Sequence, residues 1–218
     1  MLPSPGHVEH DPEAIWQSVI EAFAQARAQA GDIEIAAIGI TNQRETTVLW
    51  ERSTGRPLAP AIVWQDRRTA EHCQRLRNHG GDDRVRQTTG LLIDPYFSAT
   101  KIAWLLDNLP GAQRRAEAGE LAFGTVDSYL LWRLSGGQVH ATDVSNASRT
   151  LLLDLHTLGW SAEMCGYFGV PTAILPELKP TAGRLAVTRG EGEIPAGIPV
   201  TAAAGDQQAA LYGQDCRR

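Results

Sequence analysis

The sequence lacks the features that would place it in a membrane, in a secretory pathway or on a nucleic acid. No apolar run approaches the roughly 18 residues that a membrane helix needs. The first residues, Met1-Leu2-Pro3-Ser4-Pro5-Gly6, have neither a basic region nor an apolar core, so we expect no signal peptide there. The net charge of −5 disfavours a nucleic-acid or anionic-membrane partner.

Cysteine is also scarce. Cys73, Cys165 and Cys216 are odd in number and widely spaced, and they form neither a CxxC pair nor a credible disulfide framework. The chain has 218 residues, 43% of them hydrophobic and 21% charged, which is ordinary for a globular protein with a real core. We therefore expect a cytoplasmic, reduced, enzyme-like domain.

The common phosphate, metal and nucleophile motifs are missing as well. There is no GxxxxGK[ST] loop, and Gly190-Glu191-Gly192 lacks the third glycine and the preceding strand of a dinucleotide fingerprint. His7 and His10 lie in a Pro/Gly-rich loop with no third ligand at metal spacing. No Ser, His and Asp arrangement indicates a nucleophile elbow. The chain has no recognisable phosphate-binding loop of its own.

What the sequence does contain is a polar stretch, Thr41-Asn42-Gln43-Arg44-Glu45-Thr46, between two apolar runs. The first run, residues 35–40, predicts a strand covered on both faces. Polar side chains at the end of such a strand are expected at the carboxyl edge of a sheet, where α/β proteins bind ligands. Arg44 and Glu45 together offer donors and an acceptor, which suits a neutral polyhydroxylated molecule. The alternative is an exposed Arg/Glu pair that contributes little to stability.

The order of helical and strand patterns predicts an α/β domain. Asp11 and Pro12 begin the first helix, whose apolar stripe ends at Gly31. Asp66 is the expected cap of a polar helix at residues 69–78, and Asp127 as a cap favours helix over strand at 123–134. The further elements expected are a hairpin of residues 48–50 and 61–64 with its turn at 53–55, helices at 99–109, 160–168 and 209–212, and strands at 150–153, 184–188 and 199–204. The strand at 184–188 is expected inside a loop-rich stretch, 176–197.

Three further residues are candidates for a site. Asp206 follows a predicted buried strand and stands at a strand-to-helix turn, where it is either an N-cap or a carboxylate that accepts a proton or holds a metal ion, or both. Trp64 is either an apolar wall for a ligand's carbon skeleton or, as is usual for a lone Trp, a core aromatic. The Tyr96 hydroxyl either reaches a polar ligand or bonds to a backbone group.

With these residues laid out, the chain resembles the glycerol kinases, members of the family of carbohydrate kinases with an actin-like ATPase fold. The most specific match is Gly39-Ile40-Thr41-Asn42-Gln43-Arg44-Glu45-Thr46. The others follow in the family's order along nearly the whole chain: residues 6–12 with Ile15-Trp16, and residues 63–69, 95–101, 142–150 and 205–211. The resemblance implies an actin-like, ribonuclease H-like domain with a mixed sheet flanked by helices.

The resemblance also implies residue roles. Arg44, Glu45, Tyr96 and Asp206 would bind the hydroxyls of glycerol with Gln207 beside them, and Trp64 would lie against the carbon chain. Asp206 would be the catalytic base and a contact for Mg²⁺, with ATP as the phosphoryl donor. Full-length family members are expected to be homo-oligomers.

Two parts of the family pattern are absent. Family members carry an Asp-x-Gly-Thr-Thr phosphate loop on their first strands and a second, nucleotide-binding domain, and neither is found here. We therefore expect residues 1–213 to be the glycerol-binding domain without its first strands, residues 214–218 to begin the connection to a second domain, and the isolated chain to be nearly inactive. Two alternatives remain: a related pentulose or polyol kinase, and a non-catalytic polyol-binding or partner-binding remnant. Asn42-Gln43-Arg44-Glu45 favours glycerol over the first of these.

Overall fold

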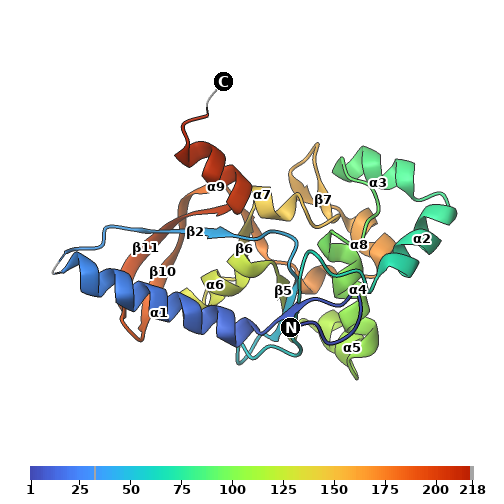
Figure 1. The fold of residues 1–218 in the computed structure, drawn as a ribbon. Helices are drawn as coiled ribbons and strands as arrows, with labels where there is room; N and C mark the ends of the chain where they lie inside the picture. Colours follow the sequence, from blue (N-terminus) through green and yellow to red (C-terminus); the bar gives the residue numbers. More distant parts are fainter. Residues whose placement is uncertain (32, 217–218) are drawn as a thin grey trace.

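The structure, a computed structural model, describes residues 1–31 and 33–216 (Figure 1). Short strands and helices alternate along the chain. In order they are β1 (Glu9–His10), α1 (Pro12–Ala30), β2 (Ile38–Asn42), β3 (Val48–Glu51), β4 (Ala61–Ile62), α2 (Ala70–Asn78), α3 (Asp82–Thr89), α4 (Ser98–Asn108), α5 (Ala112–Glu117), β5 (Leu121–Gly124), α6 (Val126–Leu134), β6 (Ala141–Asp143), α7 (Val144–Ala147), β7 (Leu153–Asp154), β8 (Gly159–Trp160), α8 (Ala162–Phe168), the 3₁₀ turn η1 (Thr172–Ile174), β9 (Glu177–Lys179), β10 (Ala182–Glu191), β11 (Ile194–Gly205) and α9 (Asp206–Gly213).

The sheet that matters for the site is mixed and has the order β10-β11-β2. β10 and β11 form a long antiparallel hairpin, and β11 runs parallel to β2 with Gly205 opposite Asn42. Two parallel strands that end in register place the residues that follow them side by side. The polar stretch after β2 and helix α9 after β11 therefore meet at one edge of this sheet (Figure 1).

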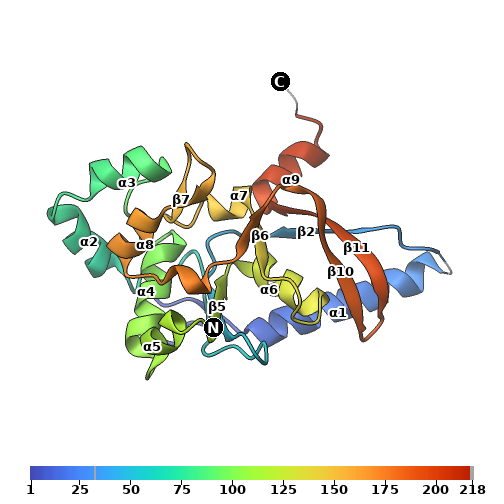
Figure 2. The ribbon, with the colours of Figure 1, turned by 180° about the vertical axis from the view of Figure 1, so that it is seen from behind.

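A second sheet, β3 paired with β5, separates two hydrophobic cores. Side chains alternate across a strand. Leu49 and Phe123 face one core, which α2, α3, α4, α5 and α8 surround, whereas Val48 and Trp50 face the other, which contains α1 and α6. Figures 1 and 2 show these two groups of helices on opposite sides of the molecule.

Several predicted elements are confirmed. Asp11 caps α1 by accepting a hydrogen bond from the Glu13 amide, Pro12 is its first residue, and Gly31 ends it in a positive-φ conformation. The helices expected at 99–109 and 160–168 are α4 and α8, the latter capped by Ser161. The strand expected at 199–204 is part of β11 and leads directly into α9.

The strand predicted at residues 35–40 is shifted and only half covered. It runs from Ile38 to Asn42, with Ile40 and Asn42 buried but Gly39 and Thr41 exposed. Ile40 belongs to the same core as the buried residues of α6, and no described element covers the opposite face. The prediction of burial on both faces was therefore wrong.

The predicted hairpin of residues 48–50 and 61–64 was also wrong. Its turn forms, because the Gly55 amide donates to the Glu51 carbonyl, but β3 pairs with β5 and β4 pairs with β1. What the structure keeps of this pairing is a bridge of Thr47 with Ile62, a bridge of Trp50 with Pro57, and a hydrogen bond from the Leu58 amide to the Leu49 carbonyl. Prolines at 57 and 60 have no amide hydrogen to donate, so a continuous ladder cannot form there.

Two other stretches differ from expectation. Residues 176–197 were predicted to be loop-rich with one strand at 184–188, yet they contain β9, all of β10 and the start of β11. The register of β10 and β11 shifts at the two places where Gly183 and Gly197 lie. Conversely, Thr150 and Leu151 form a turn rather than a strand, with Leu151 at φ 67°, and β7 holds only Leu153 and Asp154.

Unlike Asp11, the predicted caps Asp66 and Asp127 were wrong, and for the same reason. Thr69, not Asp66, precedes α2, because the Asp66 carboxylate instead accepts hydrogen bonds from the Val8 amide and the Arg68 guanidinium. Thr125 precedes α6, and Asp127 is a buried residue of its first turn. In each case a tertiary partner holds the carboxylate.

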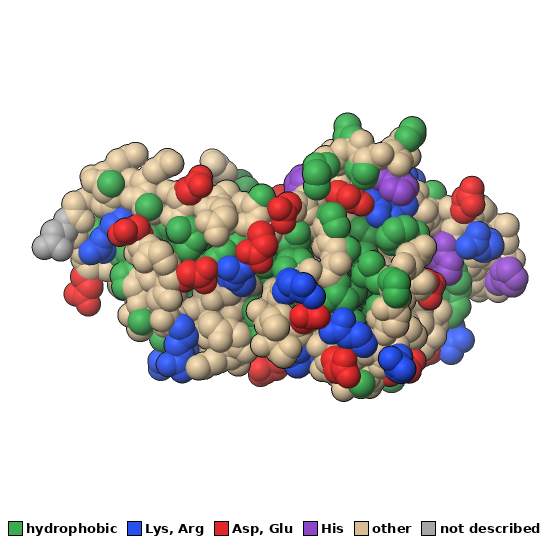
Figure 3. All heavy atoms as spheres, turned by 90° about the horizontal axis from the view of Figure 1, so that it is seen from below, with side chains coloured by type: hydrophobic (Ala, Val, Ile, Leu, Met, Phe, Trp, Pro, Cys, Tyr) green, Lys and Arg blue, Asp and Glu red, His purple; other side chains and the backbone are tan. Residues whose placement is uncertain are grey.

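Acidic and basic side chains are interspersed on the face shown in Figure 3, which carries no extended basic area of the kind that nucleic-acid binding needs. Within residues 1–31 and 33–216, no helix is both long and apolar enough to cross a bilayer.

Candidate active site

One small cleft brings together all the residues predicted to form a site. It lies where the loop after β2 meets the start of α9, and its volume is about 90 Å³. The residues that line it are Gln43, Arg44, Glu45, Trp64, Tyr96, Asp206 and Gln207. Pockets for drug-sized ligands begin near 300 Å³. This cleft therefore fits only a small molecule.

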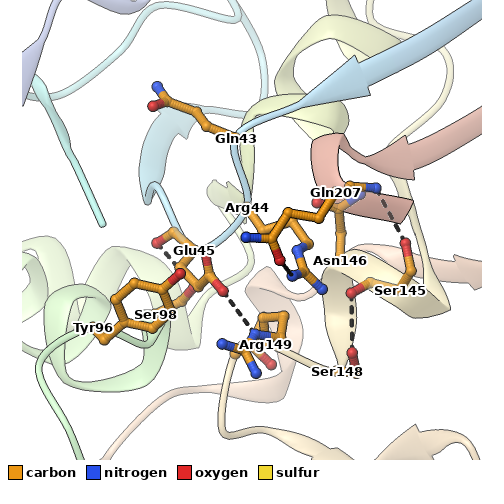
Figure 4. A network of polar contacts seen from close by, with 12 residues as sticks. Gln43, Arg44, Glu45, Tyr96, Ser98, Ser145, Asn146, Ser148, Arg149 and Gln207 are labelled. Atoms are coloured by element: carbon orange, nitrogen blue, oxygen red, sulfur yellow. Dashed lines mark hydrogen bonds and ion pairs between the residues drawn. The ribbon is translucent and has the colours of Figure 1, made fainter. Parts of the chain in front are cut away.

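Arg44 and Gln207 join the two strand ends. Nη2 of Arg44 donates to Oε1 of Gln207 at 3.0 Å, and Arg44 is only 9% exposed (Figure 4). The approach depends on Gly205, because a Cβ at that position would lie 2.7 Å from Nε of Arg44 and closer still to its Cδ. A side chain at residue 205 would displace the guanidinium from the cleft.

Glu45 does not pair with its neighbour Arg44, as the surface-pair alternative required. It is 2% exposed, and its Oε1 accepts a hydrogen bond from Nε of Arg149 at 2.7 Å. Its backbone has φ 59°, in a three-residue turn closed by the Thr46 amide and the Arg44 carbonyl at 2.7 Å. Ser98 Oγ, at the start of α4, donates to the Glu45 carbonyl at 3.2 Å. The alternative of an exposed ion pair is excluded by this burial.

Tyr96 and Trp64 form an aromatic side of the cleft. Their rings meet edge to face with centroids 5.6 Å apart, and both residues are half-buried, so Trp64 is not the core aromatic that a lone Trp usually is. The Tyr96 amide donates to Oδ1 of Asp94 at 2.9 Å. The Tyr96 carbonyl accepts from Nζ of Lys101 at 2.7 Å. The Tyr96 side chain lines the cleft (Figure 4).

Asp206 is the first residue of α9 and is exposed. It is not the N-cap, which is Gly205, and among the described residues its Oδ1 accepts a hydrogen bond only from the amide of the next residue, Gln207, at 2.8 Å. A carboxylate in the first turn of a helix is favoured by the helix dipole. The side chain is thus available to a bound molecule.

Sequence reasoning missed two cations near these residues. Arg149 lay inside a recognised block, residues 142–150, but no pattern indicated that it would reach Glu45. Lys101 is fully buried under Tyr96, and burial lowers its pKa to about 7, although the charges of Glu45, Asp66 and Asp94 oppose that shift. Neither could be assigned from spacing, since each acts on a residue from another element.

A buried polar network supports the strand ends. Nδ2 of Asn42 donates to Oδ1 of Asn146 at 2.9 Å, and Nδ2 of Asn146 donates to Oδ1 of Asp143 at 2.7 Å. Ser145 Oγ accepts from the Gly205 amide at 3.3 Å (Figure 4). These contacts fix α7 against the ends of both β2 and β11.

The described residues offer no complete metal site. Between residues 1 and 216, leaving aside residue 32, no group of three or more His, Cys, Asp or Glu is arranged to hold a metal ion. Mg²⁺ is commonly bound by one or two carboxylates together with substrate phosphates. Asp206, exposed in the cleft, fits the part of a single carboxylate ligand of that kind.

The sequence matches the N-terminal domain of the FGGY family of carbohydrate kinases over residues 1–213. This chain belongs to the FGGY family.

The FGGY relatives include glycerol kinases. The chain is 57% identical to the glycerol kinase of Alkalilimnicola ehrlichii over 217 residues, and 57% identical to that of Alcanivorax borkumensis over 219 residues. Each comparison covers 99% of this chain but only 44% of the relative. The chain therefore spans less than half the length of these FGGY kinases.

Solved structures of FGGY kinases share the fold. Plasmodium falciparum glycerol kinase, a structure with ADP, superimposes with a TM-score of 0.93 at 36% identity, covering 97% of this chain and 43% of that one. Xylulose kinase from Lactobacillus acidophilus, at 22% identity, has a TM-score of 0.87 over 99% of this chain and shows the fold alone. The expected actin-like ATPase fold is confirmed.

Proposed function

We propose that this chain carries the glycerol site of a glycerol kinase, which transfers the terminal phosphoryl group of ATP to glycerol and yields glycerol 3-phosphate. The observation that carries the proposal is the convergence of Arg44, Glu45, Tyr96, Asp206 and Gln207 on one cleft of about 90 Å³, with Trp64 on its wall. Relatives named glycerol kinase, more than half identical along the whole chain, support the same choice.

The chemistry of the cleft suits a three-carbon triol. Arg44 supplies hydrogen-bond donors, Glu45 and Asp206 supply acceptors, and the Tyr96 hydroxyl and Gln207 amide supply both. The edges and faces of Trp64 and Tyr96 offer apolar surface to the carbon chain. A site that pairs each hydroxyl also rejects analogues lacking one, because its own polar groups would then be left unpaired.

Asp206 is the proposed catalytic base. It would accept a hydrogen bond from the attacking hydroxyl, orient it, and take its proton late in the transfer. A strong base is not required for this step, since phosphoryl transfer depends mostly on positioning and on neutralising charge.

ATP and Mg²⁺ are proposed partners that this chain meets with few residues of its own. Asp206 would hold the metal as one carboxylate ligand, and the metal would neutralise charge on the nucleotide phosphates. The remaining contacts to the nucleotide would come from the parts of the kinase that this chain does not span. We likewise propose residues 1–213 as the acceptor domain, residues 214–218 as the start of the connection to a second domain, a cytoplasmic location and a homo-oligomeric full-length kinase.

Glycerol titration of the purified chain, followed by NMR or calorimetry, tests the proposal. We expect saturable binding that Glu45→Gln weakens, and very slow glycerol 3-phosphate formation from ATP. A chain that binds xylulose or ribulose more tightly than glycerol would instead support a pentulose kinase. A folded chain that binds none of these polyols would contradict the glycerol site itself.

A further inference from the structure

Arg149 connects two residues of the cleft without lining it. It follows α7, and its Nε donates to Oε1 of Glu45 at 2.7 Å across 104 positions of sequence. Its guanidinium also lies over two rings, 5.5 Å from the centroid of Tyr96 and 4.8 Å from that of Phe97. One cation therefore contacts both Glu45, from the loop after β2, and Tyr96, from the loop before α4.

Glu45 needs such a partner. Its side chain is 3% exposed, and a buried carboxylate without a cation or hydrogen-bond donors is strongly unfavourable. Its left-handed backbone costs a non-glycine residue further free energy. Among the described residues Arg149 is the one ion-pair partner of Glu45, and none of them donates a hydrogen bond to Oε2. The ion pair thus occupies one carboxylate oxygen and leaves the other for a ligand.

The segment that carries Arg149 is fixed to the same part of the fold. The Arg149 amide donates to the Asn146 carbonyl at 3.0 Å, and the Thr150 carbonyl accepts from the Ala99 amide at 2.9 Å. Ala99 is in the first turn of α4, next to Ser98, whose hydroxyl bonds to the Glu45 carbonyl. Backbone and side-chain contacts therefore hold Arg149, Glu45 and Tyr96 as one unit.

We propose that Arg149 is a positioning residue of the acceptor site, which aims Oε2 of Glu45 and the phenol of Tyr96 at the hydroxyls of glycerol. The inference rests on the proposed glycerol site. An arginine suits this task better than a lysine, because its planar guanidinium can donate along its edge while its face stacks on aromatic rings.

The test is glycerol affinity of the 218-residue chain, measured by NMR titration for Arg149→Met, Glu45→Gln and the double variant. Hydrogen bonds to charged groups correspond to affinity changes of about 10- to 100-fold, and we expect Arg149→Met to weaken binding by at least about tenfold. If Arg149 acts through Glu45, adding Arg149→Met to Glu45→Gln should change affinity by no more than about twofold.

Arg133 provides a matched control. It too pairs with a carboxylate, Glu13, at 2.7 Å and lies over an aromatic ring, that of Trp16, at 4.9 Å, but it is outside the cleft. We expect Arg133→Met to lower stability and leave glycerol affinity unchanged.

The outcomes separate the two proposals. If the wild-type chain does not bind glycerol, the proposed function fails and the inference fails with it. If the wild type binds glycerol, two results would overturn only the role of Arg149. One is that Arg149→Met binds glycerol as tightly as the wild type. The other is that the double variant loses as much affinity as the two single variants together. If Arg149→Met shows no cooperative melt, Arg149→Lys serves instead, because it keeps the charge but removes the planar guanidinium that stacks on the rings. We expect Arg149→Lys to lower the affinity for glycerol by about threefold or more. Wild-type affinity of that variant would overturn the inference.

Discussion

Arg44 and Gln207 are 163 positions apart in sequence, and a hydrogen bond of 3.0 Å from Nη2 to Oε1 joins them. The contact exists because β2 and β11 run parallel and end in register, with Gly205 opposite Asn42. It closes one side of the cleft. The geometry of the cleft therefore depends on how β2 and β11, the first and last strands of the mixed sheet, are aligned.

Gly205→Ala should weaken glycerol binding without unfolding the chain. The backbone of residue 205, at φ −59°, suits alanine, but the new methyl would lie within 2.7 Å of Nε of Arg44. The guanidinium must then move, and we expect a loss of affinity of about tenfold, similar to one charged hydrogen bond. Calorimetric titration measures it.

Gly213→Ala, at the other end of α9, is the matched control for that variant, because nothing lies within 4 Å of its added Cβ. It should bind glycerol as the wild type does. Equal affinities of Gly205→Ala and Gly213→Ala would show that Arg44 is not needed where the structure places it.

Local sequence predicted what local physics controls. Asp11, Pro12 and Gly31 identify α1, because capping and proline geometry act within a few residues. The run ending at Gly205 identifies β11 and the start of α9 for similar reasons. The sequence also indicated that Arg44, Glu45 and Asp206 would lie close together, since they follow strands and strand ends are where α/β proteins bind ligands, and all three line one cleft.

Predictions failed where a distant partner decides. Asp66 looks like a helix cap, but it accepts from the Val8 amide, 58 positions away. β3 looks like half of a hairpin, but it pairs with β5. No pattern in the sequence indicated that Arg149 would contact Glu45, 104 positions away. None of these pairings leaves a periodic signal in the sequence.

Asp127→Asn should change how stability depends on pH between about 4 and 6. Burial raises the pKa of Asp127 to about 6 from 3.8, despite hydrogen bonds from Thr125 and Thr142, and the charge of Asp143 adds to the rise. In this window the folded chain keeps a proton that the unfolded chain has lost. The contribution of Asp127 to the free energy of unfolding therefore falls as pH rises through the window.

Urea denaturation of the wild type and Asp127→Asn at several pH values tests this. We expect the stability of the wild type, relative to the variant, to decline from pH 4 to pH 6 and then level off. A difference that is constant over that range would contradict the raised pKa of Asp127.

Lys101→Met should remove a pH dependence of the opposite sign at higher pH. Burial lowers the pKa of Lys101 to about 7 from 10.5, and the groups that face it are Glu45, Asp66, Cys73 and Asp94. Between those pH values the unfolded chain holds a proton that the folded chain has released. The contribution of Lys101 to stability therefore rises with pH from about 7 to 10.5.

Denaturation of Lys101→Met and of the matched variant Lys179→Met, which removes a lysine outside the cleft at the end of β9, separates this effect from other titrations. Only Lys101→Met should lose the rise. If both variants keep the wild-type dependence, the lysine under Tyr96 is not the titrating group.

Tyr96→Phe should lower glycerol affinity while leaving stability unchanged. The variant removes only the hydroxyl, which forms no hydrogen bond with the described residues, and keeps the ring that meets Trp64, Phe97 and Arg149. A neutral hydrogen bond contributes about 0.5–1.5 kcal/mol, so we expect a loss of about 2- to 13-fold.

Tyr129→Phe is the reciprocal control for that change. The Tyr129 hydroxyl donates to Oε1 of Glu13 at 2.7 Å and accepts from Arg133 at 3.0 Å. None of these three residues lines the cleft. Loss of the Tyr129 hydroxyl should lower the melting temperature and spare glycerol binding. Thermal melts and glycerol titrations of both variants test this. Loss of a hydroxyl that binds glycerol should lower the affinity and leave the melting temperature unchanged. Loss of a hydroxyl that stabilises the fold should lower the melting temperature and leave the affinity unchanged. If Tyr96→Phe instead destabilises the chain and binds glycerol normally, the Tyr96 hydroxyl serves the fold rather than the ligand.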